Sequence, residues 1–326
     1  MMRFGLYILF LGLFLMFNGC QTLKEPHLLT LDQIVEQDEV ISLPYKLYRD
    51  SVFMVELRSL EGNLLPFIID TGATKSAIFK RTTSKLSLSE NSSSLITVHG
   101  LAEFGDRPLV EVPVLFADGV SLNNISMAVL ENPAHQSDET FSLAGLIGMD
   151  ILSNYRVYVN AENKTFNLVP TSLAEPLIPF RWEWVELKTN PYSELDHDLH
   201  FLEIRIAGQL VPALIDTGSE INFMTWGAAN YAELRQARKR LWEKWVIDGS
   251  VGEFEPEFRI LTKGFRSGQK FWDKTEFLVS DLDGLAILGF DEQPFLIAGS
   301  PLFLDQTFYL DFEKNILRFE DQRGKG

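Results

Sequence analysis

Two copies of the tripeptide Asp-Thr-Gly occur in the sequence, one beginning at Asp70 and the other at Asp216. At average residue usage, a chain of 326 residues would contain on the order of 0.1 such tripeptide by chance. Each copy ends an apolar stretch typical of a strand. Carboxyl groups serve as general acids and bases in hydrolysis, where one group deprotonates water and another protonates the reacting oxygen. The two aspartates are therefore the first candidates for chemistry.

The two motifs belong to a longer internal repeat. Residues 62–73 and 208–219 share glycine, proline and Asp-Thr-Gly at matching positions, offset by 146 residues. Alternating apolar residues at 52–58 and 201–206 predict a strand before each copy, then a turn at the glycine and a return strand into the aspartate. The repeat predicts two β-rich units of roughly 130–140 residues each.

The far ends of the two units also match. Two apolar residues followed by glycine occur at 146–148 and at 297–299, and a strand-like run follows each, at 155–159 and 308–312. Residues 287–289 have a similar composition, but the residues after them do not reproduce the pattern. We interpret 287–289 as a loop.

This arrangement resembles the retropepsin-like aspartic proteases, duplicated in one chain as in the pepsin-like proteases. The resemblance covers about Ile41 to Phe319. It implies an all-β, two-lobed β-barrel fold with a pseudo-twofold axis, and Asp70 and Asp216 as a catalytic dyad that activates water for peptide-bond hydrolysis. In such a dyad the carboxyl groups share one proton, because like charges in close contact cannot both ionise.

The resemblance also implies roles for the residues that follow each aspartate. Thr71 and Thr217 would form hydrogen bonds across the lobe interface, and Gly72 and Gly218 would let the backbone approach the carboxylates. The two hydrophobic-hydrophobic-Gly elements would pass beneath these loops.

The fourth motif residue differs between the copies, being Ala73 in the first and Ser219 in the second. We expect the Ser219 hydroxyl to donate to Asp216, which would favour ionised Asp216 and leave the shared proton on Asp70.

Two glycine-containing turns follow the aspartates by about 30 residues and fit the paired flaps of such proteases. An ordinary hairpin is the alternative, since glycine at a strand turn is common. The candidate flap residues are His99, Gly100, Leu101, Gly249 and Ser250.

The periodicity predicts one clear helix, from about Ala228 to Trp245, with Tyr231, Leu234 and Leu241 on one face. We interpret it as a helical insertion in the second lobe. It has no expected counterpart in the first, where residues 80–94 are polar and Ser-rich.

Neither a metal nor a cofactor is expected. Residues 196–200, Asp-His-Asp-Leu-His, could ligate a metal but precede a strand and lack a partner cluster. The sequence contains no His-Glu-x-x-His, no Gly-x-Ser-x-Gly and no phosphate-binding loop.

The N-terminus has the pattern of a targeting segment. Arg3 precedes an apolar run at 4–17, which is short for a membrane span, and Cys20, the sole cysteine, follows directly. This resembles the lipobox of bacterial lipoproteins, although Phe17 and Asn18 depart from the usual residues there. It implies lipidation of Cys20; an uncleaved anchor or an ordinary signal peptide is the alternative. Gln21 favours the outer membrane, with the protein facing the periplasm or the exterior.

The net charge of −16 argues against nucleic-acid binding. We expect a monomer, since one chain supplies both aspartates, with a peptide or protein substrate and a membrane contact through the lipid. The predicted order is a signal peptide (1–19), a lipidated N-terminus and tether (20–40), a first lobe (41–170), a linker (171–185) and a second lobe (186–326).

Two functions fit these features. The first is an aspartic endopeptidase, favoured because both motifs are intact. The second is a catalytically silent envelope lipoprotein that binds peptides or a protein partner in the same cleft, since a fold does not guarantee activity.

Overall fold

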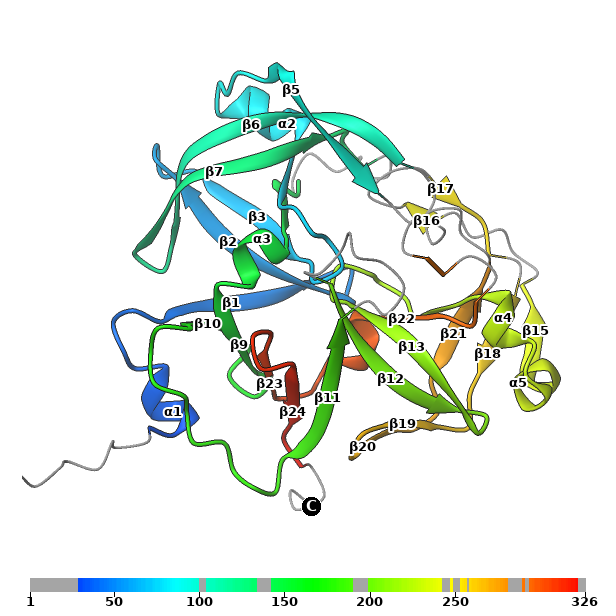
Figure 1. Cartoon of the computed structure of the whole chain (residues 1–326). Helices are drawn as coiled ribbons and strands as arrows, with labels where there is room; N and C mark the ends of the chain where they lie inside the picture. The colour runs from blue at the N-terminus through cyan, green and yellow to red at the C-terminus, as the bar shows by residue number, and fades with distance from the viewer. Residues whose placement is uncertain are drawn as a thin grey trace, which may run out of the picture.

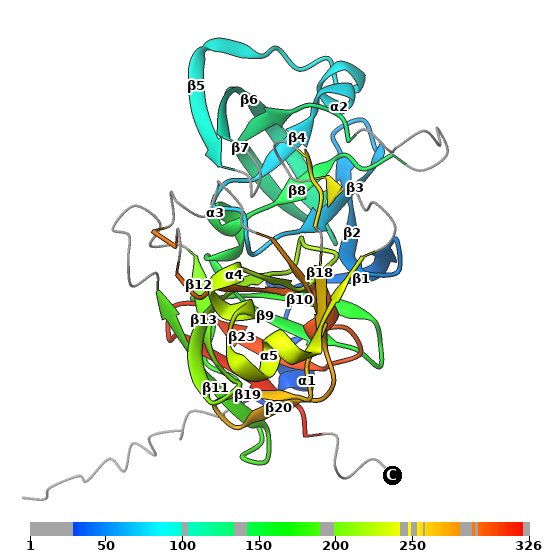
Figure 2. The same cartoon turned by 90° about the vertical axis from the view of Figure 1, so that its right-hand side faces the viewer.

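The chain forms two β-barrels that share one sheet (Figure 1). Figure 2 shows the first barrel above the second. The computed structural model describes residues 29–99, 104–133, 142–189, 199–241, 247–248, 253–256, 258–280, 289–290 and 293–321. The expected all-β, two-lobed fold is confirmed. The predicted signal peptide, Cys20 and residues 287–288 lie outside the described residues.

A six-stranded antiparallel sheet joins the two lobes. In spatial order its strands are β1 (Ile41–Tyr48), β10 (Thr165–Pro170), β9 (Tyr155–Asn160), β23 (Phe308–Asp311), β24 (Ile316–Phe319) and β11 (Glu183–Thr189). Tyr158 lies opposite Tyr309 at its centre. The pseudo-twofold axis therefore passes between β9 and β23, and the strands that end the two repeat units meet in the middle of one sheet.

The first barrel closes through six strands. In order these are β2 (Val52–Ser59), β3 (Leu64–Ile69), β8 (Gly145–Ile147), β4 (Ala77–Phe79), β7 (Val120–Leu130) and β6 (Phe104–Ala117), which pairs back with β2. The strand β5 (Asn91–His99) pairs with the start of β6. Burial along β3 alternates residue by residue, as expected for a strand with one face in the core.

The second barrel repeats this order. Its strands are, in order, β12 (His200–Ile206), β13 (Gln209–Asp216), β22 (Leu296–Gly299), β14 (Phe223–Met224), β21 (Glu276–Val279) and β18 (Phe258–Leu261). Three further strands pair with these: β15 (Arg238–Arg240) with β18, β19 (Phe265–Ser267) with β12, and β20 (Lys270–Trp272) with β19. The single strand β6 corresponds to β18 and β19, which are interrupted at Gly264. Its φ of +126° is a conformation that favours glycine.

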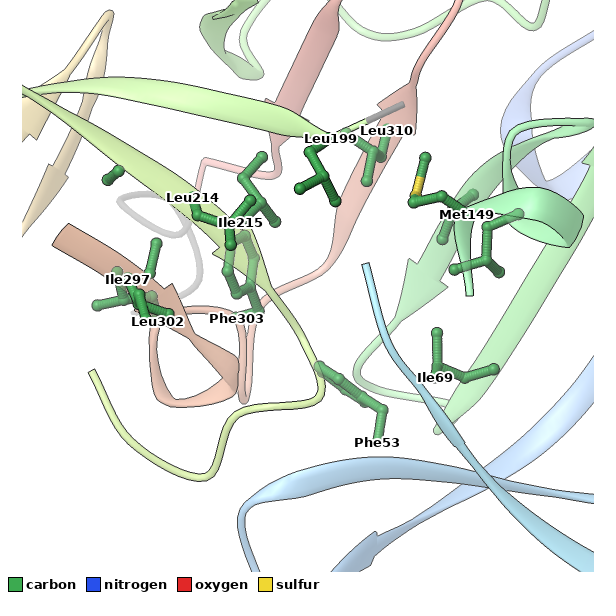
Figure 3. Packing of buried hydrophobic residues seen from close by; sticks show 14 of the residues in the cluster. Phe53, Ile69, Met149, Leu199, Leu214, Ile215, Ile297, Leu302, Phe303 and Leu310 are labelled. Atoms are coloured by element: carbon green, nitrogen blue, oxygen red, sulfur yellow. The ribbon is translucent and has the colours of Figure 1, made fainter. Parts of the chain in front are cut away.

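One hydrophobic core extends through both lobes. Ile69 and Met149 of the first lobe and Ile215 and Phe303 of the second belong to the same cluster (Figure 3). The ring of Phe53 also lies near the pseudo-twofold sheet, 6.3 Å from that of Phe308 between the ring centroids. Because the residues just before both aspartates are part of this core, packing fixes the positions of both motifs.

The predicted helix at 228–245 is wrong in its extent. The structure has two short helices, α4 (Trp226–Ala229) and α5 (Ala232–Ala237), and the chain then pairs with β18 as strand β15. The guanidinium of Arg238 lies 4.8 Å from the ring centroid of Trp226 and 5.0 Å from that of Phe258. Ladder hydrogen bonds and these contacts thus override the local helical pattern.

A counterpart in the first lobe also exists, contrary to expectation. The helix α2 (Lys80–Lys85) follows β4 as α4 follows β14, and their first residues are 146 positions apart. Two further one-turn helices, α3 (Met149–Leu152) and the 3-10 helix η2 (Ser300–Leu302), occupy matching places after β8 and β22. The helical insertion is therefore limited to α5.

Residues 29–40 were expected to form part of a tether, but they pack on the protein. Thr30 and Gln33 form a capping box that begins helix α1 (Leu31–Ile34). Leu31 is buried with Trp182 and with Tyr158 and Tyr309 of the shared sheet. The apolar residues of this short segment are thus satisfied by tertiary contacts.

The predicted linker, 171–185, overlaps a strand, because β11 begins at Glu183 and pairs with β24.

Within the described residues, no helix has both the length and the apolar character needed to cross a membrane.

Candidate active site

The two Asp-Thr-Gly loops are set by equivalent strand pairings. Strand β3 runs parallel to β8, and the Asp70 N–H donates to the Ile147 carbonyl at 2.9 Å. Strand β13 runs parallel to β22, where Asp216 lies opposite Gly299. The hydrophobic-hydrophobic-Gly elements therefore lie beside the two loops, as predicted.

The threonines link the lobes by reciprocal hydrogen bonds. The Thr71 N–H donates to the Thr217 hydroxyl, and the Thr217 N–H donates to the Thr71 hydroxyl, both at 3.1 Å. Each hydroxyl also donates to a carbonyl of the opposite lobe, that of Ile215 at 2.8 Å and that of Ile69 at 2.7 Å. All four bonds are buried and cross the pseudo-twofold axis. They bring together the two loops that carry the aspartates.

Gly72 and Gly218 each face the aspartate of the other lobe. A Cβ atom on Gly72 would lie 2.6 Å from Cγ of Asp216, and one on Gly218 would lie 2.4 Å from Cγ of Asp70. Neither distance is compatible with a side chain larger than hydrogen. The glycine of the motif is thus required by the close approach of the opposite carboxylate.

The glycines of the two hydrophobic-hydrophobic-Gly elements, Gly148 and Gly299, are also required by a close approach. A Cβ on Gly148 would lie 2.7 Å from the Ala73 carbonyl oxygen, and one on Gly299 would lie 2.0 Å from the Ile221 carbonyl oxygen. The backbone at each of these glycines passes directly against the backbone that follows the aspartate.

Each carboxylate is held by a backbone donor of its own loop. The Gly72 N–H donates to Oδ1 of Asp70 at 2.9 Å, and the Gly218 N–H donates to Oδ1 of Asp216 at 3.0 Å. Both bonds favour the ionised form and lower the pKa of their carboxyl groups. The two donors fix both carboxylates in equivalent orientations.

Burial dominates the protonation of the pair. It raises the pKa of Asp216 to about 6. Burial and then the neighbouring charge of Asp216 raise the pKa of Asp70 well above its usual range. The hydrogen bond between the two carboxyl side chains raises the pKa of Asp70 further and lowers that of Asp216. The dyad therefore holds one proton on Asp70 when Asp216 is ionised.

The expected bond from the Ser219 hydroxyl to Asp216 is wrong. This hydroxyl donates instead to the Ile221 carbonyl at 2.9 Å, within its own loop. The backbone N–H groups of Ser219 and Ala73 each lower the pKa of the adjacent aspartate. The difference in side chain between Ala73 and Ser219 thus leaves the hydrogen bonds to the dyad equivalent.

Sequence reasoning missed the residues that support the two loops from behind. Ser76 Oγ accepts from the Gly148 N–H at 3.0 Å, and Asn222 Oδ1 accepts from the Gly299 N–H at 3.0 Å. Ser300 Oγ donates to the Thr217 carbonyl at 2.6 Å. Ser76 and Asn222 are 146 residues apart, which is the offset of the repeat. The offset could have identified them as equivalent positions, but their residue types differ.

Two ion pairs near the motifs were also unexpected. Lys75 pairs with Asp150 at 2.9 Å within the first lobe, and Arg49 pairs with Glu220 at 3.2 Å across the lobes. Both are partly exposed, and such pairs contribute little stability.

Paired strands flank the candidate flap residues. Strands β5 and β6 pair up to His99 and Phe104, and the short strands β16 (Ile247–Asp248) and β17 (Glu253–Phe254) pair with each other. Gly100, Leu101, Gly249 and Ser250 lie outside the described residues. The flap role of these residues stays a prediction.

The possible metal ligands at 196–200 are only partly described. His200 is buried, and its Nε2 lies 3.2 Å from the Phe312 carbonyl oxygen. Residues 196–198 are outside the described part of the chain, and the described residues contain no group of three or more potential metal ligands.

Comparison with protein families agrees with this geometry. Residues 57–151 match the family model described as aspartyl protease. The match supports membership of an aspartic-protease-like family, and it includes the first Asp-Thr-Gly and the Gly148 element. A search of curated proteins found no significant match.

A solved structure supports the double-barrel fold over most of the chain. It is the crystal structure of conglutin gamma, a basic 7S globulin from lupine seeds. The likeness covers 87% of this chain and 95% of the globulin, with a TM-score of 0.50 and 10% sequence identity. At that identity the likeness concerns the fold alone.

The threonine bonds predict a large difference between two substitutions. Thr217→Val keeps the side-chain shape but leaves the Thr71 N–H and the Ile69 carbonyl without their partner. We expect it to lower the free energy of unfolding by about 2–5 kcal/mol, because buried groups lose hydrogen bonds. Thr217→Ser retains the hydroxyl and should cost about 1 kcal/mol or less. Denaturant unfolding measures both, and equal stabilities would contradict the bonding scheme.

The raised pKa of Asp216 predicts that Asp216→Asn stabilises the fold at neutral pH. Folding raises the pKa of this carboxyl from 3.8 to about 6. The folded protein therefore has its full free energy of unfolding below pH 3.8, and the part that depends on protonated Asp216 is lost as the pH rises through 6. Asparagine does not ionise and so avoids this loss. The free energy of unfolding of the variant should therefore be higher at pH 7.5 by up to about 3 kcal/mol.

At pH 3.5 the difference between Asp216→Asn and the unchanged protein should vanish, because Asp216 is then protonated in both the folded and the unfolded chain. Thermal unfolding at the two pH values provides the measurement. Exposed Glu111→Gln is the control and should show no such gain. A stabilisation by Asp216→Asn that is the same at both pH values would rule out the ionisation effect.

Proposed function

We propose that this protein is an aspartic endopeptidase that hydrolyses peptide bonds with a water molecule activated by Asp70 and Asp216. The observation that carries the proposal is the reciprocal threonine bonding, which places two equivalent carboxylates together across the pseudo-twofold axis. The aspartyl protease match over residues 57–151 supports the same activity. One chain supplies both halves of the site, so a monomer suffices, and the proposed chemistry uses no cofactor.

The unequal pKa values assign the two roles. Ionised Asp216 takes a proton from the attacking water, while Asp70 gives its proton to the carbonyl oxygen of the substrate. The water oxygen bonds to the carbonyl carbon and forms a tetrahedral diol. When the carbon–nitrogen bond breaks, Asp216 gives its proton to the leaving amine, and Asp70 takes a proton from one diol hydroxyl as the diol becomes the carboxylic acid product. One proton then remains on the pair, as at the start.

The rigidity of the site contributes to the rate. Backbone N–H groups of Gly72 and Gly218 orient the carboxylates before substrate binds, so little reorganisation is needed in the transition state. The hairpins β5–β6 and β16–β17 would close over the peptide as flaps, which would exclude water from the reaction.

We also propose that the protein works in a bacterial cell envelope, anchored by lipid on Cys20. The support is the sequence pattern, a short apolar run at 4–17 followed three residues later by the only cysteine. The outer membrane is the proposed destination, with the lobes in the periplasm or at the exterior, and periplasmic or external proteins and peptides as substrates.

Substitution of either aspartate tests the activity. We expect Asp70→Asn and Asp216→Asn each to lower kcat/KM on a peptide library by at least about 1000-fold, because each removes half of the acid–base pair. Peptide binding should persist, since the amide keeps the shape of the side chain. Glu111→Gln is a matched surface control that should keep full activity.

Cleavage that survives either dyad substitution would refute the proposed mechanism. If the unchanged protein binds peptides but cleaves none between pH 3 and 8, the alternative of a silent peptide-binding lipoprotein would replace the enzyme.

The dyad predicts a bell-shaped pH profile. Activity needs one proton on the pair, so kcat/KM should fall below pH about 6, where Asp216 becomes protonated. It should fall again at higher pH, where Asp70 loses its proton. Asp216 sets the acid limb, and initial rates across pH 3–9 measure it. An optimum at pH 3 would contradict the raised pKa of Asp216.

A further inference from the structure

The shared sheet separates the two barrels from the N-terminal segment. In β9 and β23, Val157 and Phe308 face the core that joins the lobes. The neighbouring residues Tyr158 and Tyr309 point to the opposite face, where they pack against Leu31 of α1. The Asp-Thr-Gly loops follow strands β3 and β13 of the barrels, and α1 packs on the outer face of the sheet through Leu31.

The N-terminal segment is attached to the linker on this outer face. The Leu177 N–H donates to the Leu29 carbonyl at 2.7 Å, and Thr30 forms a parallel bridge with Leu177. Cys20 precedes Leu29 by nine residues, which can span at most about 30 Å. A lipid on Cys20 would therefore keep this part of the linker close to the bilayer.

The same segment carries exposed apolar side chains. Among the described residues, ten large apolar side chains are exposed, and three of these, Leu177, Phe180 and Trp184, lie within eight residues of sequence. Phe180 is fully exposed, and Leu177 is 51% exposed. Single exposed apolar residues are ordinary, but such a group beside an attachment point indicates an interaction site. Tryptophan and arginine, here Trp184 and Arg181, are favoured at the membrane interface.

Three acidic residues in and beside this segment are paired with lysines. Glu183 pairs with Lys270 at 3.0 Å, and Glu186 pairs with Lys188 at 2.8 Å. Glu175 pairs with Lys314. Although the whole chain has a net charge of −16, these pairs locally offset the negative charge that would oppose contact with a phospholipid surface.

We propose that Leu177, Phe180, Arg181 and Trp184, the linker face, contact the lipid bilayer. This contact rests on the proposed anchor at Cys20, and together the two hold the outer face of the shared sheet against the membrane. The dyad then opens away from the bilayer. The substrates would be aqueous proteins and peptides rather than segments embedded in the membrane.

A site-specific fluorescent label tests the contact. Cys20 is the only cysteine and would be acylated, so an introduced cysteine becomes the reactive thiol. Phe180→Cys and, as control, Leu64→Cys of the first barrel are made in the full chain; Leu64 is also exposed. Each is labelled with the fluorophore NBD and placed in phosphatidylethanolamine–phosphatidylglycerol vesicles that contain a nitroxide lipid. We expect quenching at 180 to exceed that at 64 at least threefold.

Flotation separates failure of the anchor from failure of the linker face. Both labelled proteins should float with the vesicles, and Cys20→Ser should float far less. Equal quenching at 180 and 64 in floating protein would overturn the bilayer contact while leaving the anchor intact. Protein that does not float would overturn both. Peptidase activity is measured separately, since Phe180 and Leu64 lie outside the dyad. The presence or loss of that activity tests only the proposed enzymatic function and not the bilayer contact.

Discussion

The structure depends on four buried hydrogen bonds between two threonines and the opposite lobes. They lie on the pseudo-twofold axis, and they fix the position of two loops that belong to different barrels. The motif glycines then bring each loop against the carboxylate of the other. Because a single chain contains both copies, this alignment is reached by folding and not by association.

Bringing two carboxyl groups together in a buried place opposes stability, and it would serve the proposed hydrolysis. Burial disfavours the charged forms, and the pair is therefore held with one proton. A protein selected for stability alone would have no reason to keep two such acids in contact. Their presence, with oriented backbone donors, is what makes hydrolysis a better explanation of the site than a structural role.

The shared sheet has two different faces with two different uses. Its inner face joins the hydrophobic cores of both lobes, so that movement at one motif is resisted by packing at the other. Its outer face holds α1 and the linker. The proposed attachment on this side would leave the side of the dyad unobstructed, which would relate the proposed anchor at Cys20 to access of a substrate.

The sequence by itself determined the repeat, the strands around each motif, the dyad and the elements beside it, because these depend on local alternation and on identical residues at a fixed offset. It did not determine the partner of the Ser219 hydroxyl, the end of the helix at Ala237 or the packing of α1. Each of these is decided by groups that come close only in the folded chain: the Ile221 carbonyl turned back within its own loop, β18 beside Arg238, and the outer face of the sheet beside Leu31. Local patterns describe what a segment can form, and contacts between distant segments select among those forms.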